Sequence, residues 1–362
     1  MKFLKFALES FWGRCYTKTA MIKDFFEWFE NWEENKKFDS LDLSSNGFFA
    51  SGISSVSKGQ ISADGGNYYI KTPHSRSYKF GYVNLRYERQ DNALATMSEL
   101  IAKKRYKQFR FLYANYRPLY RDRSVLTKND YDIIWKNRHV YNYEEMYKKG
   151  VYMLVSPSLT SEMVDTISFG DIVTIGLKLT KHNKAEQVMY DNLENMLDAK
   201  QYYLKFMTEH CYDKLVQFVL ASIFEFSNDD HFDNIMLCKN RDGDKYEDLF
   251  LFDKESTAFN PFVAIDMSLS AIKYRAQNHM SYNGMPITQV GERTVIRMYE
   301  LTRLINKGKL EKKHIDFLEA IAGVNFEKLA QEIKEETGLV ANQKQLDMYK
   351  YGADFAGIIA GK

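Results

Sequence analysis

The segment from Asp213 to Phe226, DKLVQFVLASIFEF, is apolar on nearly every side, and it constrains the fold more than any other part of the chain. A helix that is apolar all round is stable in water only when other elements cover it. The chain has 362 residues, which is enough to build such a core. We therefore expect a buried central helix here, and we expect the polar segment after it to be held at the end of a rigid element.

Composition excludes several classes of protein. The 19 glycines and 5 prolines are few, which favours helices over a many-turned β-sandwich. The chain has 50 basic and 48 acidic residues, and it lacks the basic excess of a dedicated nucleic-acid binder, so we expect no direct nucleic-acid partner. The chain contains no run of 18 apolar residues, so we expect no transmembrane helix. The N-terminus does not have the pattern of a secretory signal, so we expect none. The three widely spaced cysteines fit a reducing compartment, so the expected location is cytoplasmic.

Patterns along the chain predict three regions. Residues 1–40 contain Phe25, Phe26 and Phe29 at helical spacing, which predicts a helix that packs its aromatic face on the main domain. A helix that binds a membrane surface or a partner is the alternative. Residues 41–155 are predicted to form a small β-rich lobe that binds a nucleotide, and residues 156–362 a larger helical lobe. The sequence thus predicts an α+β fold with a cleft between two lobes.

Within the β-rich region, closely spaced glycines separate short strand-like runs, which predicts a small antiparallel sheet. These runs are Gly47–Ala50, Gln60–Ser62 and Tyr68–Lys71. A helix is expected over Asn92–Phe109, and a further strand over Val151–Val155 that stops at Ser156-Pro157. The remaining chain is mostly helical in pattern, and one helix is predicted to begin after Asn325 and to end at Gly338.

The polar loop Ser227–Leu237, SNDDHFDNIML, is the segment that most clearly indicates chemistry. Asp229 and Asn234 lie in this loop, and Asp253 ends the short apolar run that follows a turn at Asp242-Gly243. One carboxylate can accept a proton from an attacking hydroxyl. The other carboxylate and the amide oxygen can hold Mg²⁺, which prefers oxygen ligands. That division of roles is the one used in phosphoryl transfer from ATP.

The β-rich region supplies matching parts. Lys71 ends a predicted strand and can reach the phosphates of a nucleotide, and Glu99 on the next helix can pair with it; Glu88 is a rival partner. Upstream, residues 51–59 form a Ser/Gly segment whose backbone N–H groups can cover phosphates. Its candidate nucleotide-binding residues are Ser54, Ser55, Ser57 and Lys58. The segment lacks the G-K-[ST] ending of a Walker A loop, which disfavours a P-loop NTPase.

The order D-x-H-x-x-N, formed by Asp229, His231 and Asn234, resembles the catalytic loop of HipA-like serine/threonine kinases. It is also similar to the corresponding loop of phosphatidylinositol 3- and 4-kinases, especially over D-x-H-x-D-N-I-M. The resemblance implies a two-lobed protein-kinase-like fold, with ATP and Mg²⁺ as cofactors. It implies Asp229 as the catalytic base, His231 as a residue that orients the loop or touches phosphate, Asn234 and Asp253 as metal ligands, and Lys71 as the phosphate lysine.

The chain departs from the patterns of known kinases at three points. Asp253 is followed by Lys-Glu rather than the Phe-Gly of ordinary protein kinases, and Asp230 replaces the arginine of the lipid kinases. His231 follows Asp229, unlike the H-x-D order of ordinary protein kinases. The expected acceptor is a serine or threonine of a protein substrate. A lipid or small-molecule kinase is one alternative, and a pseudokinase that binds nucleotide without turnover is another. The sequence leaves the oligomeric state open.

Overall fold

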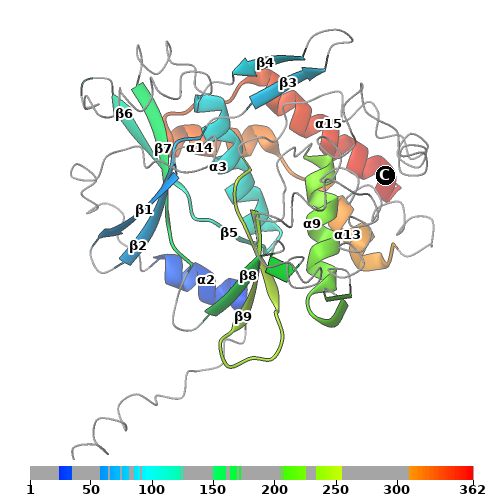
Figure 1. The fold of residues 1–362 in the computed structure, drawn as a ribbon. Helices are drawn as coiled ribbons and strands as arrows, with labels where there is room; N and C mark the ends of the chain where they lie inside the picture. Colours follow the sequence, from blue (N-terminus) through cyan, green and yellow to red (C-terminus); the bar gives the residue numbers. More distant parts are fainter. Residues whose placement is uncertain are drawn as a thin grey trace, which may run out of the picture.

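Two four-stranded sheets and several helices make up the described part of the chain in this computed structural model (Figure 1). The structure describes residues 24–34, 58–63, 66–73, 76–80, 85–89, 92–122, 124, 150–159, 164–168, 171–172, 205–206, 208–225, 234–254 and 310–361. The α+β class predicted from the sequence is confirmed. The assignment of residues 1–40, 41–155 and 156–362 to an extension and two lobes stays a prediction.

The first sheet has the strand order β1-β2-β7-β6 and is antiparallel throughout. Its strands are β1 (Lys58–Ala63), β2 (Gly66–Lys71), β7 (Gly150–Pro157) and β6 (Arg117–Asp122). In β2 exposed and buried side chains alternate from Asn67 to Ile70, as expected of a strand with one covered face. The predicted strand runs at 60–62 and 68–71 are therefore confirmed, whereas the run at 47–50 lies outside the described residues.

The second sheet has the order β5-β10-β9-β8. Its strands are β5 (Leu112–Tyr113), β10 (Asp248–Leu251), β9 (Ile235–Asn240) and β8 (Val164–Ser168). The β9–β10 hairpin turns where the sequence predicts, and Gly243 N donates to Asn240 O at 2.8 Å. Most described residues after Pro157 are helical, as expected, and β8 is a further strand that the sequence analysis did not predict. Strand β8 is short and is stabilised by pairing with β9. No local sequence pattern predicts this pairing.

A separate two-stranded hairpin consists of β3 (Arg76–Phe80) and β4 (Leu85–Arg89). The helices are α2 (Phe25–Glu34), α3 (Asn92–Gln108), α9 (Tyr212–Phe224), α13 (Lys312–Ala322), α14 (Phe326–Thr337) and α15 (Gln343–Ala360). Helix α9 contacts α13, α15 and β10, and its apolar residues are buried in the main core, which confirms the predicted central helix. Helix α14 is capped as predicted: Asn325 accepts from Lys328 N at 2.8 Å, and Gly338 adopts a left-handed φ of 74°.

Helix α2 packs on the main core through Phe25 and Phe29, which confirms the expected packing of an N-terminal aromatic face. The ring centroids of Phe29 and Phe250 lie 5.8 Å apart. Glu30 forms an ion pair with Lys107 of α3. Among the described helices, none combines the length and the hydropathy needed to cross a bilayer.

Three sets of contacts hold helix α3 in place. At its N-terminus, Asn92 Nδ2 donates to the carbonyls of Pro73 and Tyr152 at 2.7 and 3.0 Å, which ties the helix to the ends of β2 and β7. In its middle, Gln345 of α15 donates to Ser98 Oγ at 2.6 Å. The third set lies near its C-terminus, where the buried guanidinium of Arg105 pairs with Glu225 at the end of α9. Helix α3 is thus anchored to both the first sheet and the C-terminal helices.

Arg105 and its neighbour Lys104 offer a test of this anchoring. Arg105→Met leaves Glu225 buried without its cation, so we expect the free energy of unfolding to fall by about 3 kcal/mol or more. Lys104 pairs with Glu332 and Glu336 on the surface of α14, so Lys104→Gln is expected to cost less than about 1 kcal/mol. Urea denaturation of the two variants measures the difference. Equal losses would contradict the anchoring role of Arg105.

Candidate active site

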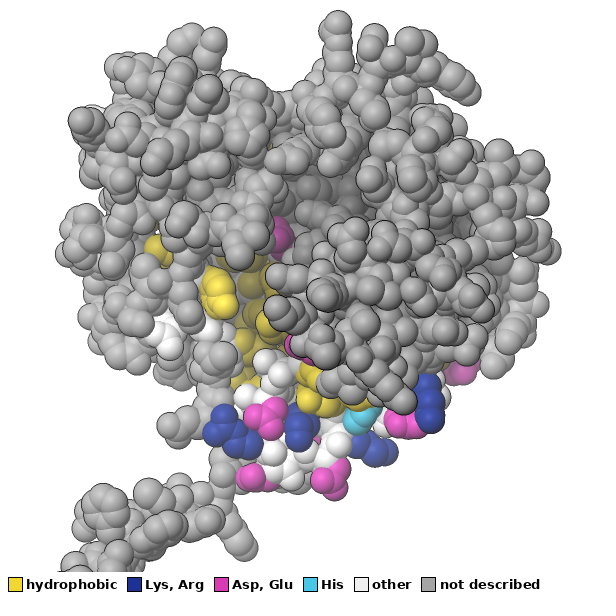
Figure 2. Space-filling model, viewed as in Figure 1, with side chains coloured by type: hydrophobic (Ala, Val, Ile, Leu, Met, Phe, Trp, Pro, Cys, Tyr) yellow, Lys and Arg dark blue, Asp and Glu magenta, His cyan; other side chains and the backbone are white. Residues whose placement is uncertain are grey.

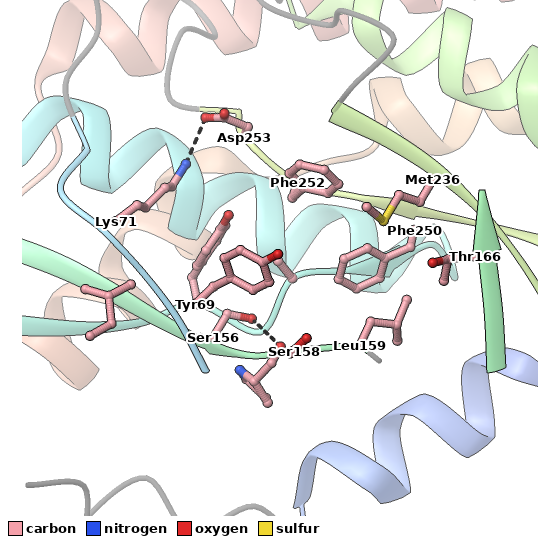
Figure 3. A pocket seen from close by; sticks show the side chains of 14 residues that line it. Tyr69, Lys71, Ser156, Ser158, Leu159, Thr166, Met236, Phe250, Phe252 and Asp253 are labelled. Atoms are coloured by element: carbon pink, nitrogen blue, oxygen red, sulfur yellow. Dashed lines mark hydrogen bonds and ion pairs between the residues drawn. The ribbon is translucent and has the colours of Figure 1, made fainter. Parts of the chain in front are cut away.

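Lys71 ends strand β2 with its ammonium group inside the protein. The residue is 4% exposed, and Nζ forms an ion pair with Glu99 and donates to Asp253 Oδ1 at 2.9 Å (Figure 3). A buried charge is tolerated only when it is paired and hydrogen-bonded. The cluster joins three segments that lie far apart in the sequence: the end of β2, the middle of α3 and the residues after β10.

Glu99 is fully buried in α3, and its two oxygens have different partners. Oε1 faces Lys71, and Oε2 accepts a hydrogen bond from the Tyr113 hydroxyl at 2.5 Å. Burial raises the pKa of Glu99 above its ordinary value. The positive charge of Lys71 lowers this pKa, and the negative charge of Asp253 raises it further. Burial and the Glu99 charge raise the pKa of Tyr113, so its hydroxyl keeps the proton that it donates.

The Lys71–Glu99 ion pair is present as the sequence analysis expects, across 28 positions of the chain. The rival Glu88 lies in β4, and its side chain is outside the described residues. The anchoring of α3 explains the pairing, because Asn92 fixes the start of the helix beside the end of β2. The middle of the helix, where Glu99 lies, then stands beside the lysine.

Asp253 follows β10 with a left-handed φ of 67°. This conformation costs a non-glycine residue about 1 kcal/mol, although aspartate adopts it more readily than most. The next residue, Lys254, is buried; its Nζ donates to Ser222 Oγ of α9 at 3.3 Å and lies 4.8 Å from the ring centroid of Phe218. The chain around Asp253 is therefore fastened to the central helix, which offsets the cost of the unusual backbone.

The ion cluster lies at one end of a cavity between the two sheets. The first sheet and the residues after it contribute Tyr69, Ile70 and residues 156–159, and the second sheet contributes Thr166, Met236 and Phe250, followed by Phe252. Figure 2 shows hydrophobic side chains gathered in a hollow on this face, and Figure 3 shows the aromatic and aliphatic walls leading to Lys71 and Asp253. The empty volume is about 800 Å³, part of it open to solvent.

The structure brings together three of the predicted site residues: Lys71, Glu99 and Asp253. Asn234 is buried immediately before β9, the strand that contributes Met236 to the cavity. Lys58, predicted in the Ser/Gly loop, instead begins β1, and its side chain is outside the described residues. Five further predicted residues lie outside the described part of the chain: Ser54, Ser55, Ser57, Asp229 and His231. Their roles stay predictions.

Sequence reasoning missed two tyrosines beside the cluster. Tyr113 donates to Glu99, and the ring centroid of Tyr116 lies 4.8 Å from Lys71 Nζ, which is a favourable distance for a cation–π contact. Both belong to the run FLYANY at 111–116, of which every residue is buried. This short, strongly aromatic run was the available indication, since buried tyrosines need partners for their hydroxyls.

Oxygen donors are the metal-binding groups that this site offers. Within the described residues, no group of three or more His, Cys, Asp and Glu side chains is arranged to hold a metal ion. The carboxylate of Asp253 and the side-chain oxygen of Asn234 are hard donors that suit Mg²⁺, which commonly takes one or two carboxylates together with phosphate oxygens. Within the described part of the chain, these donors fit a magnesium–nucleotide site.

Comparisons with known proteins find little relationship at the level of sequence. The chain matches no protein-family profile, and it matches no curated protein sequence. Among solved structures it is similar to the crystal structure of the Helicobacter pylori proinflammatory kinase CtkA, at 13% sequence identity and a TM-score of 0.41. The alignment covers 88% of this chain and 98% of CtkA. A similarity this distant leaves the functional argument to the geometry of the site.

Lys71→Met tests the electrostatics of the cluster. In the wild type, the raised pKa of Glu99 means that the folded state holds a proton more tightly than the unfolded state, so this group stabilises less as pH rises above about 4.5. Removing the Lys71 charge raises this pKa further. We expect the variant to be less stable than the wild type at pH 7 by about 3 kcal/mol, and the difference to shrink towards pH 4. Urea denaturation across this pH range would contradict the account if the difference were constant.

Proposed function

We propose that this protein is an ATP- and Mg²⁺-dependent kinase that transfers the γ-phosphate to a serine or threonine hydroxyl of a protein. The observation that carries the proposal is the buried Lys71 ammonium, paired with Glu99 and Asp253, at the end of a largely apolar cavity. A nucleotide has the same division between a flat, weakly polar base and a highly charged phosphate chain. The resemblance of the 229–234 loop to HipA-like kinases supports the same reading from an independent part of the sequence.

In this proposal each described residue has a physical task. Met236, Phe250 and Leu159 offer an apolar surface for the base. Lys71 contributes positive charge to the phosphates, and Glu99 holds the lysine in the orientation that this requires. Asp253 and Asn234 hold Mg²⁺, which, when bound, neutralises charge on the phosphate oxygens.

The acceptor hydroxyl is activated by Asp229, which accepts its proton. The described helix α9 ends at Phe224, close in sequence to this residue, and Glu225 is held by Arg105. The chain is thus held in the core as far as Glu225, a few positions before Asp229 in the sequence, which supports the assignment of a base that must be positioned accurately. His231 orients the loop or touches phosphate.

A lipid or small-molecule acceptor is the second candidate. The observation that favours it is the sequence D-x-H-x-D-N-I-M, from Asp229 to Met236, which matches the lipid kinases closely. Radiolabel transfer from ATP to phosphatidylinositol vesicles and to a protein acceptor such as casein separates the two. Label that goes to lipid alone would replace the protein-kinase proposal.

The catalytic assignment is tested with Asp229→Ala in an assay of phosphate transfer from γ-labelled ATP, including transfer to the protein itself. Loss of the base is expected to lower the rate by about 10²–10⁴-fold, because that is the usual contribution of a positioned general base. The neighbouring carboxylate variant Asp230→Asn is the matched control and should retain the rate within a few-fold.

Full activity in Asp229→Ala would refute the assignment of the base. A wild-type protein that binds ATP but transfers phosphate to no acceptor, itself included, would refute the kinase proposal. That result would identify a pseudokinase that acts as a regulatory module.

A further inference from the structure

Glu225, which directly follows α9, is a buried glutamate like Glu99. Its Oε1 forms an ion pair with the guanidinium group of Arg105, and its Oε2 accepts a hydrogen bond from the Tyr106 hydroxyl at 2.9 Å. Arg105 and Tyr106 are consecutive residues of α3, the helix that carries Glu99. An ionised carboxylate inside a protein needs partners of this kind, so the end of α9 is tied to α3 at this point.

Two stacked tyrosines connect the two glutamates. The Tyr113 hydroxyl donates to Glu99 at 2.5 Å, and the Tyr106 hydroxyl donates to Glu225 at 2.9 Å. The two rings are nearly parallel, with an interplanar angle of 6° and centroids 5.3 Å apart. Both tyrosines are buried. A continuous series of direct contacts therefore runs from the Lys71–Glu99 pair to the end of α9.

Tyr106 also contacts the segment after β10. The Nζ atom of Lys254 lies 5.6 Å from the centroid of the Tyr106 ring, which is within the range of a cation–π contact. Lys254 directly follows Asp253, the proposed metal ligand. Tyr106 thus contacts Tyr113, Lys254 and Glu225. These three adjoin different parts of the candidate active site, namely the lysine pair, the metal aspartate and the chain that leads to the proposed base.

The ring and the hydroxyl group of Tyr106 have separate contacts. The ring packs against Tyr113 and Lys254, and this packing does not require the hydroxyl. The hydrogen bond to Glu225 depends on the hydroxyl alone. Tyr106 does not line the cavity that ends at Lys71, so we expect it to act on a ligand only through its neighbours.

We infer that Tyr106 is a positioning residue for the candidate active site: its ring supports the Lys71–Glu99 pair, and its hydroxyl fixes the end of α9 ahead of Asp229. The inference rests on the proposed function, because it assigns the hydroxyl to the transfer step rather than to the binding of ATP. A hydrogen bond to a carboxylate is stronger than one between neutral groups. Its loss is therefore expected to loosen the chain that positions the base while the lysine pair stays in place.

Steady-state kinetics of phosphate transfer and calorimetric titration of ATP with Mg²⁺ test this division on Tyr106→Phe and Tyr113→Phe, which both keep the aromatic ring. Tyr106→Phe is expected to lower kcat by about tenfold, the equivalent of one such hydrogen bond, and to leave the Kd of ATP within about twofold of the wild type. Tyr113→Phe is expected to weaken ATP binding by about tenfold, because it removes the hydrogen bond that holds Glu99 beside Lys71.

Tyr246→Phe is the matched control. Tyr246 lies between β9 and β10, and its ring packs against Phe206 and His210. The variant removes the same hydroxyl group at a distance from the contacts of Tyr106, so kcat and ATP affinity should both match the wild type. An unchanged kcat in Tyr106→Phe, or a loss of kcat and ATP affinity together, would contradict the inference.

Hydrogen exchange of residues 218–225 separates this inference from the proposed function, because it requires no activity. Glu225 N donates to Ala221 O at 3.0 Å at the end of α9. Tyr106→Phe is expected to raise the exchange rate of these backbone amides by about tenfold relative to the wild type and to Tyr246→Phe.

A wild type that transfers no phosphate would refute the proposed function, and the exchange rates would then decide the inference alone. Faster exchange in Tyr106→Phe would support the tie between α3 and α9 through this hydroxyl. Equal exchange in Tyr106→Phe and Tyr246→Phe would refute it, whether or not the protein transfers phosphate.

Discussion

A buried lysine ammonium group is the interaction on which the rest of this structure depends. Lys71 is removed from water at the end of β2, and two carboxylates from distant parts of the chain compensate its charge. Burial favours the protonated form of Glu99, and the charge of Lys71 opposes this. Without the lysine, the carboxylate of Asp253 would lose a buried cationic partner. The three side chains join β2, α3 and the segment after β10.

The surroundings of the cluster keep it assembled. Helix α3 carries Glu99 and is tied at its start to the first sheet by Asn92, in its middle to α15 by Gln345, and near its end to α9 by Arg105. Moving Glu99 away from Lys71 would require several of these buried contacts to break together. The charges are therefore held in place before any ligand arrives, which is the condition under which electrostatic stabilisation is most effective.

The features that could be predicted from the sequence are those with local causes. Helix α14 begins after Asn325 and ends at Gly338, and both boundaries could be predicted because cap residues act within one turn of a helix. Helix α9 could be predicted because its apolar character is evident from its own sequence. The Lys71–Glu99 pair could be predicted because the lysine ends a recognisable strand and the glutamate lies in the first recognisable helix after it, with the β3–β4 hairpin between them. By contrast, β8 is defined by its pairing with β9, and Tyr113 by its contact with Glu99. These are long-range relations that no short sequence pattern encodes.

The candidate nucleotide site is predictable in part for the same reason. Lys71 and Asp253 stand at or just after the ends of strands, where a charged residue after an apolar run is easily recognised, whereas Glu99 lies in the middle of α3. Its apolar walls come from Ile70, Leu159, Met236 and Phe250, which in the sequence resemble ordinary core residues.

The most direct test of the central claim is a calorimetric titration of ATP, in Mg²⁺ and in EDTA, against the wild type, Asp253→Asn and Asp248→Asn. Asp248 is a suitable control because it is buried at the start of β10, the strand that Asp253 follows, and it does not line the cavity. We expect Mg²⁺-dependent binding in the wild type and in Asp248→Asn, and at least tenfold weaker binding in Asp253→Asn. No binding at millimolar ATP, or equal binding in EDTA and in Asp253→Asn, would contradict a magnesium–nucleotide site at the Lys71 cluster.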